Sequence, residues 1–217
     1  MKLSVVTARL GLGFVLSASL PVFAADGQGA LIQLRVSVFN SSPISSSTIE
    51  RAEGEAGRVL RGAGVEAIWL NCPQEMSQEA SLGRCSEVFF PSHLHLQILR
   101  ISHGLKISTI GISFSAKDGR GCYADLFYEP IQQLEEETHV SPSIILGHAI
   151  AHELGHLLLG TNSHSESGLM RAHWTREDLT NASKGKLRFS KEQCVKIRSR
   201  LTTSEYVEIA TVAMGQN

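Results

Sequence analysis

Apolar and polar positions repeat along the chain with two periods, and each period predicts a type of element. Residues 31–39 and 92–101 alternate apolar with polar side chains, which predicts two strands, and the short segment 65–70 predicts another strand between them. Residues 47–61 repeat with the helical period, and Gly62 ends that pattern. The apolar side of this helix consists of Ile49, Ala52, Ala56, Val59 and Leu60. The order strand, helix, strand favours parallel pairing through a right-handed crossover.

The strand at 92–101 and the segment that follows it are the most polar parts of the predicted sheet. One face of this strand consists of Leu94, Leu96 and Ile98, and the other of His93, His95 and Gln97. We expect the histidine-bearing face to be solvated, and a second metal site formed by its two histidines is the alternative. Residues 111–128 combine a glycine-rich turn with a short apolar run, which predicts a loop leading into an edge strand beside a cleft.

A strongly apolar helix is predicted between Ser141 and Gly160. Ser141 is a good N-cap, Pro142 suits the first helical position and Gly160 is a good C-terminal stop. The large apolar side chains at helical spacing are Leu146, Ile150, Leu154, Leu157 and Leu158. This stripe predicts that the helix packs one side on a core and turns its other side towards a cleft.

A final helix is predicted after residue 190. Ser190 and Gln193 form a capping-box pattern at its start. The residues expected to point inward are Cys194, Ile197 and Leu201. We expect this helix to close the domain.

The side of the apolar helix opposite its leucines carries His152, Glu153 and His156 in the H-E-x-x-H pattern of zinc hydrolases. At about 100° per residue, His152 and His156 stand one turn apart, so both imidazoles can reach one ion at about 2.0–2.1 Å. Glu153 is rotated by about 100°, which puts its carboxylate beside the metal, where it can accept a proton from the attacking water. Polar side chains on so apolar a helix need partners, and this favours a metal site over a chance match.

A third ligand is expected directly after this helix. Following a glycine reversal, the chain can return His164 to the metal, and three protein ligands leave one position of zinc open for water. Glu166 and His173 are the alternative third ligands. His148 shares the face of the two motif histidines but lies two turns below His156, so we expect a packed or supporting histidine there.

These residues together resemble the metzincin zinc proteases, in particular their matrixin-like branch. Metzincins carry a long H-E-x-x-H helix, a glycine turn, a third histidine often followed by serine, and a methionine turn beneath the metal. The matching positions are His152, Glu153, His156, Gly160, His164, Ser165 and Met170. The spacing departs from the family pattern H-E-x-x-H-x-x-G-x-x-H, because His164 lies eight residues after His156 instead of six. The helix or the turn must absorb the two additional residues, which a loop does at small cost.

The resemblance implies an α+β fold of the zincin or metzincin type. In that fold a twisted mixed sheet carries a long active-site helix, an upstream packing helix and a C-terminal helix. The implied ligands of one Zn²⁺ per chain are His152, His156 and His164, and the implied structural supports are Met170 and Gly160. Met170 could instead be an ordinary core methionine. The tyrosine that some metzincins place after this turn has no counterpart here, and the candidates for stabilising the oxyanion are Tyr123, Tyr128 and His173.

The expected function is that of a zinc metalloendopeptidase with Glu153 as the general base. A peptide substrate would be held in extended form by pairing with residues 111–114. One alternative is a non-catalytic zinc-binding or interaction module, in which Glu166 or His173 would fill the fourth position of the metal. The other alternative is a hydrolase of non-peptide amides, which shares the metal chemistry.

The first 24 residues predict a secretory signal peptide. They contain a short basic start, an apolar run and a small-residue end, and we expect cleavage after Ala24. A retained anchor helix is the alternative. Residues 25–217 suit one catalytic domain, which we expect to be a secreted or periplasmic monomer without a membrane anchor.

The exported part carries 18 basic and 21 acidic residues, a formal charge of −3, once Lys2 and Arg9 are removed with the signal peptide. Such a balance provides no basic field for nucleic acid or anionic membrane, so we expect only peptide or protein substrates as partners.

All four cysteines lie in the exported part, which predicts two disulfides in an oxidising compartment. Cys72 and Cys85 bracket a polar loop and form the favoured pair. By elimination, Cys122 would then pair with Cys194. A cysteine zinc site is disfavoured because the sequence contains no C-x-x-C spacing.

Overall fold

The computed structural model describes residues 30–73, 79–101, 104, 106 and 108–214. The predicted signal peptide and its cleavage site lie outside these described residues. In the described part of the chain, none of the helices is both long enough and apolar enough to span a membrane.

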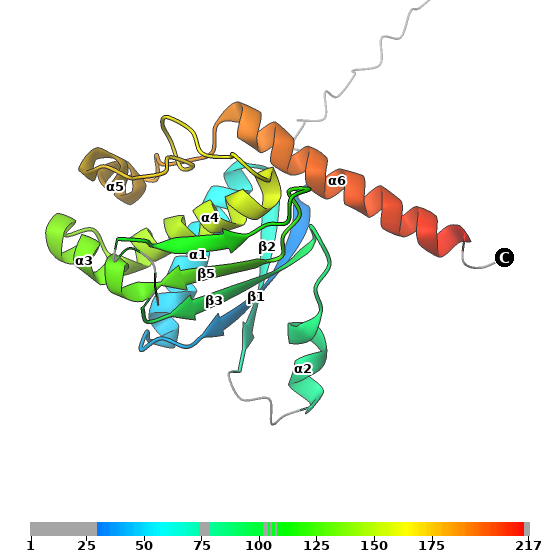
Figure 1. The fold of residues 1–217 in the computed structure, drawn as a ribbon, viewed down its shortest axis with the longest axis horizontal. Coiled ribbons are helices and arrows are strands. Elements are labelled where there is room, and N and C mark those ends of the chain that lie inside the picture. The colour runs from blue at the N-terminus through cyan, green and yellow to red at the C-terminus, as the bar shows by residue number, and fades with distance from the viewer. Residues whose placement is uncertain (1–29, 74–78, 102–103, 105, 107, 215–217) are drawn as a thin grey trace, which may run out of the picture.

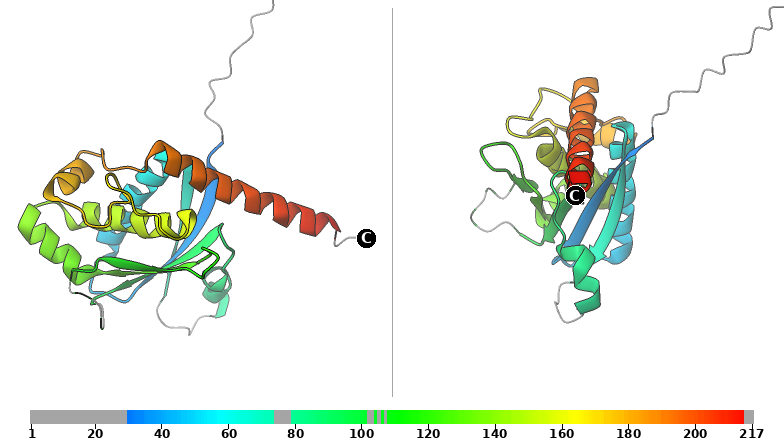
Figure 2. Two further views of the ribbon diagram at one scale, coloured as in Figure 1. Left: turned by 45° about the horizontal axis from the view of Figure 1, so that its top comes forward. Right: turned by 90° about the vertical axis from the view of Figure 1, so that its right-hand side faces the viewer.

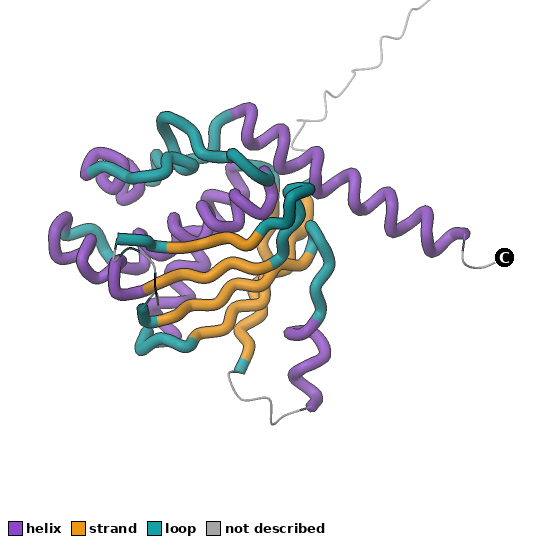
Figure 3. The backbone as a smooth tube through the Cα atoms, viewed as in Figure 1, coloured by secondary structure: helices purple, strands orange, loops and turns teal. Residues whose placement is uncertain are grey.

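In the part of the chain that the structure describes, five strands form one twisted mixed sheet (Figure 3). The strands are β1 (Ile32–Asn40), β2 (Val65–Cys72), β3 (His93–Leu99), β4 (Gly111–Phe114) and β5 (Tyr123–Phe127). Their spatial order is β2-β1-β3-β5-β4; β1 is parallel to β2 and β3, β3 is parallel to β5, and β4 is antiparallel to β5. The predicted parallel pairing of β1 and β2 through α1 is therefore confirmed.

Within the described ranges, six helices accompany the sheet (Figure 1). They are α1 (Ser46–Gly62), α2 (Glu79–Ser86), α3 (Tyr128–Thr138), α4 (Pro142–Leu159), α5 (Arg176–Ser183) and α6 (Lys191–Met214). α1 and α4 pack on each other and on the sheet, and the start of α6 packs on α4. The C-terminal half of α6 extends away from the rest of the molecule (Figures 1 and 2).

The core lies between the sheet and the helices α1 and α4. The alternating residues of β1 and β3 that face it are fully buried or nearly so, as are the predicted apolar sides of α1 and α4. The two helices approach closely at Gly147, where an added Cβ atom would lie 2.6 Å from the backbone oxygen of Ala52. A side chain at this position would force the helices apart, so the glycine fixes the depth at which α4 sits.

The expected edge strand is present, but at an earlier position in the chain. Residues 123–127 form β5, which lies inside the sheet between β3 and β4, and residues 111–114 form the edge strand β4. The edge strand expected at residues 111–114 beside the cleft is confirmed, whereas placing the edge at residues 123–127 was wrong because β5 pairs in parallel with β3, which is distant in sequence. Apolar pattern alone cannot distinguish a paired from an unpaired strand edge.

The face of β3 that carries the histidines is less solvated than expected. His93 is buried, and its Nε2 atom lies 2.9 Å from the hydroxyl of Ser37 on β1. The ring of His95 lies against Phe39 and Tyr123, at centroid separations of 5.5 and 5.2 Å. Cross-strand neighbours therefore cover these rings, which accounts for the difference from the expectation.

Of the two predicted disulfides, one is present and the other is not. Cys72, at the end of β2, is joined to Cys85 in α2, as predicted. Cys122 and Cys194 are free thiols, so the second predicted disulfide was wrong. Cys122 precedes β5, whereas the sulfur of Cys194 faces the carbonyl oxygen of Gly62 at the end of α1. Pairing by elimination ignores the Cα separation of about 4.4–6.8 Å that a disulfide requires.

Non-reducing peptide mapping is expected to recover Cys72 linked to Cys85 and to find Cys122 and Cys194 alkylated. Reduction, or the double substitution of Cys72 and Cys85 by alanine, should lower the free energy of unfolding by about 2–4 kcal/mol in denaturant titrations, because the crosslink restricts the unfolded chain. The same double substitution of Cys122 and Cys194 serves as the control, since neither thiol is crosslinked. A peptide containing Cys122 bonded to Cys194 would contradict this assignment.

Candidate metal centre

The candidate metal centre is built on α4, which begins and ends at the expected residues, although the side chain of Ser141 makes no capping hydrogen bond. Ser141 is the N-cap residue, Pro142 is the first helical residue, and Gly160 ends the helix with φ of 85°. The backbone N–H of Gly160 donates to the carbonyl oxygen of His156 at 2.9 Å. Because φ is positive at Gly160, a residue with a side chain would be strained there, and the chain reverses at this point.

His152 and His156 direct their ring nitrogens at one point. Their Nε2 atoms lie 3.0 Å apart. Nitrogens that share a tetrahedral zinc at about 2.0–2.1 Å lie about 3.3 Å apart, so this pair needs only a small opening to bind one ion. The Nδ1 atom of His152 donates to the carbonyl oxygen of Leu169 at 2.8 Å, which leaves the lone pair on Nε2.

A similar contact orients the second histidine of α4. The Nδ1 atom of His156 lies 2.7 Å from the hydroxyl oxygen of Ser163. When Nδ1 carries the proton and donates it to this oxygen, Nε2 of His156 is available to a metal. Ser163 belongs to the turn after α4, so the same turn that reverses the chain also fixes this ring.

His164 completes a group of three. The ring nitrogens available from His152, His156 and His164 all lie within 4.8 Å of one another, and the His164 ring is 4.6 Å from that of His156. Neither Glu166 nor His173, the alternative ligands, belongs to this group. One of the two additional residues of the motif lengthens α4, which runs to Leu159 before Gly160, and the other lies in the turn between Gly160 and His164, where Asn162 adopts a left-handed conformation with φ of 58°.

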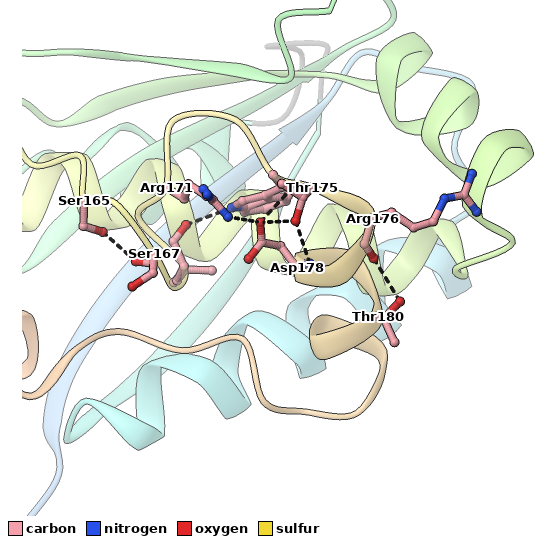
Figure 4. Close-up of polar contacts among 9 residues, drawn as sticks. Ser165, Ser167, Arg171, Thr175, Arg176, Asp178 and Thr180 are labelled. Carbon is pink, nitrogen blue, oxygen red and sulfur yellow. Dashed lines mark hydrogen bonds and ion pairs between the residues drawn. The ribbon is translucent and has the colours of Figure 1, made fainter.

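A polar network holds the loop that carries His164 (Figure 4). The backbone N–H of Ser165 donates to the carbonyl oxygen of Met170 at 2.9 Å, which closes the loop on itself. Farther along, the side chain of Arg171 donates to Asp178 at 3.1 Å, and Thr175 and Asp178 form a reciprocal capping box at the start of α5. The loop is thus tied to a helix end, which keeps His164 over α4.

Met170 packs against α4. Its side chain is buried against Gly155, where an added Cβ atom would lie 2.6 Å from the methionine sulfur. The neighbouring carbonyl oxygen of Leu169 accepts from both His152 and the indole N–H of Trp174, the latter at 3.0 Å. The turn that contains Leu169 and Met170 therefore supplies the acceptor that sets the tautomer of His152.

Several of these contacts were not predicted from the sequence. Ser163 and Trp174 carry no motif that marks them, and a backbone carbonyl such as that of Leu169 leaves no trace in side-chain patterns. The sequence signal that could have found Ser163 and Trp174 is their position within ten residues of His164, in the loop expected to return that histidine to the metal. His148 is buried outside the group of three, donates from Nδ1 to Ile144 at 2.8 Å, and is a packed histidine as expected.

Glu153 lies between the metal centre and the edge strand β4. Its side chain is buried, and its Oε2 atom accepts a hydrogen bond from the hydroxyl of Ser113 at 2.6 Å. An added Cβ atom at Gly111 would lie 2.7 Å from Oε1. Burial raises the pKa of Glu153 to about 7, and the hydrogen bond from Ser113 acts in the opposite direction.

These groups open into one cleft of about 780 Å³. Its walls are formed by β4, α3, the side of α4 that carries the motif histidines, and the loop after it. Of the three residues proposed to stabilise an oxyanion, His173 lines the cleft, whereas Tyr123 and Tyr128 are not among its lining residues. Tyr123 instead lines a separate hollow with Phe39 and His95.

The donor set fits one zinc ion per chain. Burial lowers the pKa of His152 to about 4 and that of His156 to about 3, so both imidazoles are neutral at neutral pH, the state that binds a metal. Three histidine nitrogens are a ligand set that zinc uses in catalytic sites, with a fourth position left for water. The Nδ1 contacts of His152 and His156 supply the supporting hydrogen bonds that such ligands need.

Comparisons with known proteins bear on the fold. No family model matches the chain, and no curated protein matches it. Among solved structures, a zinc-dependent peptidase from Methanocorpusculum labreanum (strain Z) is similar, with a TM-score of 0.51 and 11% identity over 75% of this chain and 99% of that chain. An archaemetzincin from Methanopyrus kandleri gives a TM-score of 0.46 and 16% identity over 82% of this chain and 99% of that chain. The likeness to the first structure confirms the expected α+β fold, and the chemistry must be argued from the site.

Proposed function

We propose that this protein is a zinc-dependent metallopeptidase that cleaves peptide bonds within extended substrates. One observation carries the proposal: three histidine nitrogens within 4.8 Å of one another share a cleft with a buried glutamate that is not part of that group. The matrixin-like arrangement of His152, His156, His164 and Met170 belongs to the same proposal. The shared fold supports it.

The residues have separate tasks in this mechanism. A zinc ion held by the three histidines would polarise the scissile carbonyl and increase the acidity of the attacking water. Glu153 takes a proton from that water as it attacks and returns a proton to the leaving amine. Its burial suits both steps, because a carboxyl group with a pKa near 7 exchanges protons readily at neutral pH. His173 is the residue of the cleft that we propose for stabilising the oxyanion.

The edge strand β4 is the proposed binding surface for the substrate backbone. Among the residues that the structure describes, β4 pairs only with β5, and residues 111–113 line the cleft. A free strand edge can pair with an extended peptide through main-chain hydrogen bonds. Binding along a strand accommodates chain on both sides of the scissile bond, which favours an endopeptidase over an exopeptidase.

The proposed location is outside the cytoplasm, as a secreted or periplasmic monomer. The basic and apolar pattern of residues 1–24 supports export. The disulfide between Cys72 and Cys85 is in keeping with an oxidising compartment.

Purified full-length protein is expected to bind one zinc per chain and to cleave internal bonds in a library of extended peptides, with products identified by mass spectrometry. A chelator should stop the cleavage and added zinc should restore it. If the protein holds one zinc but cleaves no peptide, the non-catalytic binding module is favoured instead. Hydrolysis of simple non-peptide amides without peptide cleavage would favour the amide hydrolase.

A further inference from the structure

Two residues of β4 face the side chain of Glu153, and the chemistry of each suits this contact: one has a hydroxyl group and the other has no side chain. Gly111 and Ser113 lie two positions apart, so they are on the same side of the strand, directed at α4. Ser113 places its hydroxyl 2.6 Å from Oε2 of Glu153 and 2.9 Å from the backbone carbonyl oxygen of the same residue. Gly111 has no side chain where the carboxyl group lies. Strand and helix thus meet at this one residue.

We infer that Ser113 is a positioning residue for the general base, an inference that rests on the proposed peptidase function. The Ser113 hydroxyl holds Oε2 of Glu153 and leaves Oε1 to take the proton from the attacking water. Gly111 provides the space in which the held carboxyl group sits. In the described part of the chain, Ser113 is the only side chain that is hydrogen-bonded to this carboxyl group.

The physical need for such a contact follows from the length of the glutamate side chain. Its carboxyl group can rotate about several bonds, whereas a general base must lie within about 2.6–3.2 Å of the proton that it accepts. Displacement of a reacting group by about 1 Å can cost about 100-fold in rate. A hydrogen bond from a hydroxyl on a paired strand limits the rotation of the carboxyl group before substrate binds.

The same contact links the base to the substrate surface. β4 is the strand that we propose to pair with the peptide, and Ser113 directs its side chain away from that edge towards α4. The position of the peptide and the position of the base are therefore set by one strand. Loss of the hydroxyl should alter the chemical step and leave the backbone pairing of the substrate intact.

The test compares Ser113→Ala, Ser113→Thr and Gly111→Ala with wild type, and Ser199→Ala serves as the control because Ser199 is exposed on α6. Zinc content and circular dichroism establish that each variant is folded and loaded. Ser113→Ala is expected to lower kcat about tenfold with KM unchanged. Ser113→Thr, which retains a hydroxyl on a β-branched residue, should keep kcat near wild type. Gly111→Ala should lower kcat because the added methyl group displaces the carboxyl group.

A second measurement does not depend on activity. In protein labelled with ¹³C at the glutamate carboxyl carbons, the Glu153 signal is identified by its loss in Glu153→Gln. Ser113→Ala should shift this signal, whereas Ser113→Thr and Ser199→Ala should not. If wild type cleaves no peptide, the proposed function fails, and the carboxyl signal still decides whether Ser113 holds Glu153. Unchanged kcat or an unshifted signal in Ser113→Ala would overturn the inference, as would an equal loss in Ser113→Thr.

Discussion

Replacement of Glu153 by glutamine is expected to lower peptide hydrolysis by about 10²–10⁴-fold, the usual contribution of general acid-base catalysis. Glutamine keeps the shape of the side chain and can still accept the hydrogen bond from Ser113, but it cannot take up a proton. Zinc content and thermal stability should stay close to wild type, because Glu153 lies outside the group of three histidines. The measurements are initial rates on a cleaved peptide, zinc per chain and a melting curve.

Glu53→Gln is the matched control for this substitution. Glu53 is also a buried glutamate, and its Oε2 atom accepts a hydrogen bond from Asn71, but it lies on α1 and is not among the residues that line the cleft. Its replacement should leave the rate unchanged. The proposed mechanism is wrong if Glu153→Gln cleaves as fast as wild type while holding one zinc.

Single substitution of His152, His156 or His164 by alanine is expected to reduce zinc affinity by more than about 100-fold and to abolish hydrolysis. Loss of a supporting contact already costs about 10–100-fold in metal affinity, and loss of a ligand should cost more. Zinc per chain after dialysis against a weak chelator gives the readout. His164→Ala is the most direct of the three because His164 is exposed, so its replacement should not disturb the core.

Glu166→Ala and His173→Ala are the comparisons for this series, since both residues were alternative ligands. Both variants should retain one zinc per chain, because neither residue belongs to the group of three. If Glu166→Ala loses its zinc and His164→Ala keeps it, the third ligand is the carboxylate of Glu166 and not His164. If only His173→Ala loses its zinc, the third protein ligand is His173, in the segment after Met170.

Much of the metal centre was predictable because its first part is local. An α-helix places residues four positions apart on one face, so the positions of His152 and His156 followed from the sequence once the caps at Ser141 and Gly160 predicted the helix. The apolar stripe on the opposite side predicted which side is buried. The strand, helix and strand at the start of the fold were predictable for the same reason, since each depends on a period within a short segment.

Other features depend on contacts between distant residues, and patterns within one segment do not encode them. Ser113 lies 40 residues before Glu153, and its role depends on β4 being the strand that lies beside α4. Cys122 and Cys194 were expected to pair by elimination, whereas both are free thiols in the structure. His93 appeared to be on a solvated face, but Ser37 of the neighbouring strand is within hydrogen-bond distance of its ring.

The sequence by itself determined the helix of the candidate zinc site, the direction of its two histidines, the element types around it and the return of a third histidine after the glycine reversal. The tertiary structure decided which strand forms the edge of the cleft, which atoms fix the histidine tautomers and which side chain holds Glu153. The physical reason is that helix geometry and capping arise from hydrogen bonds between residues a few positions apart. Strand order and the contacts of buried polar groups arise instead from packing of the whole chain, where each polar atom must find a partner among residues far away in sequence.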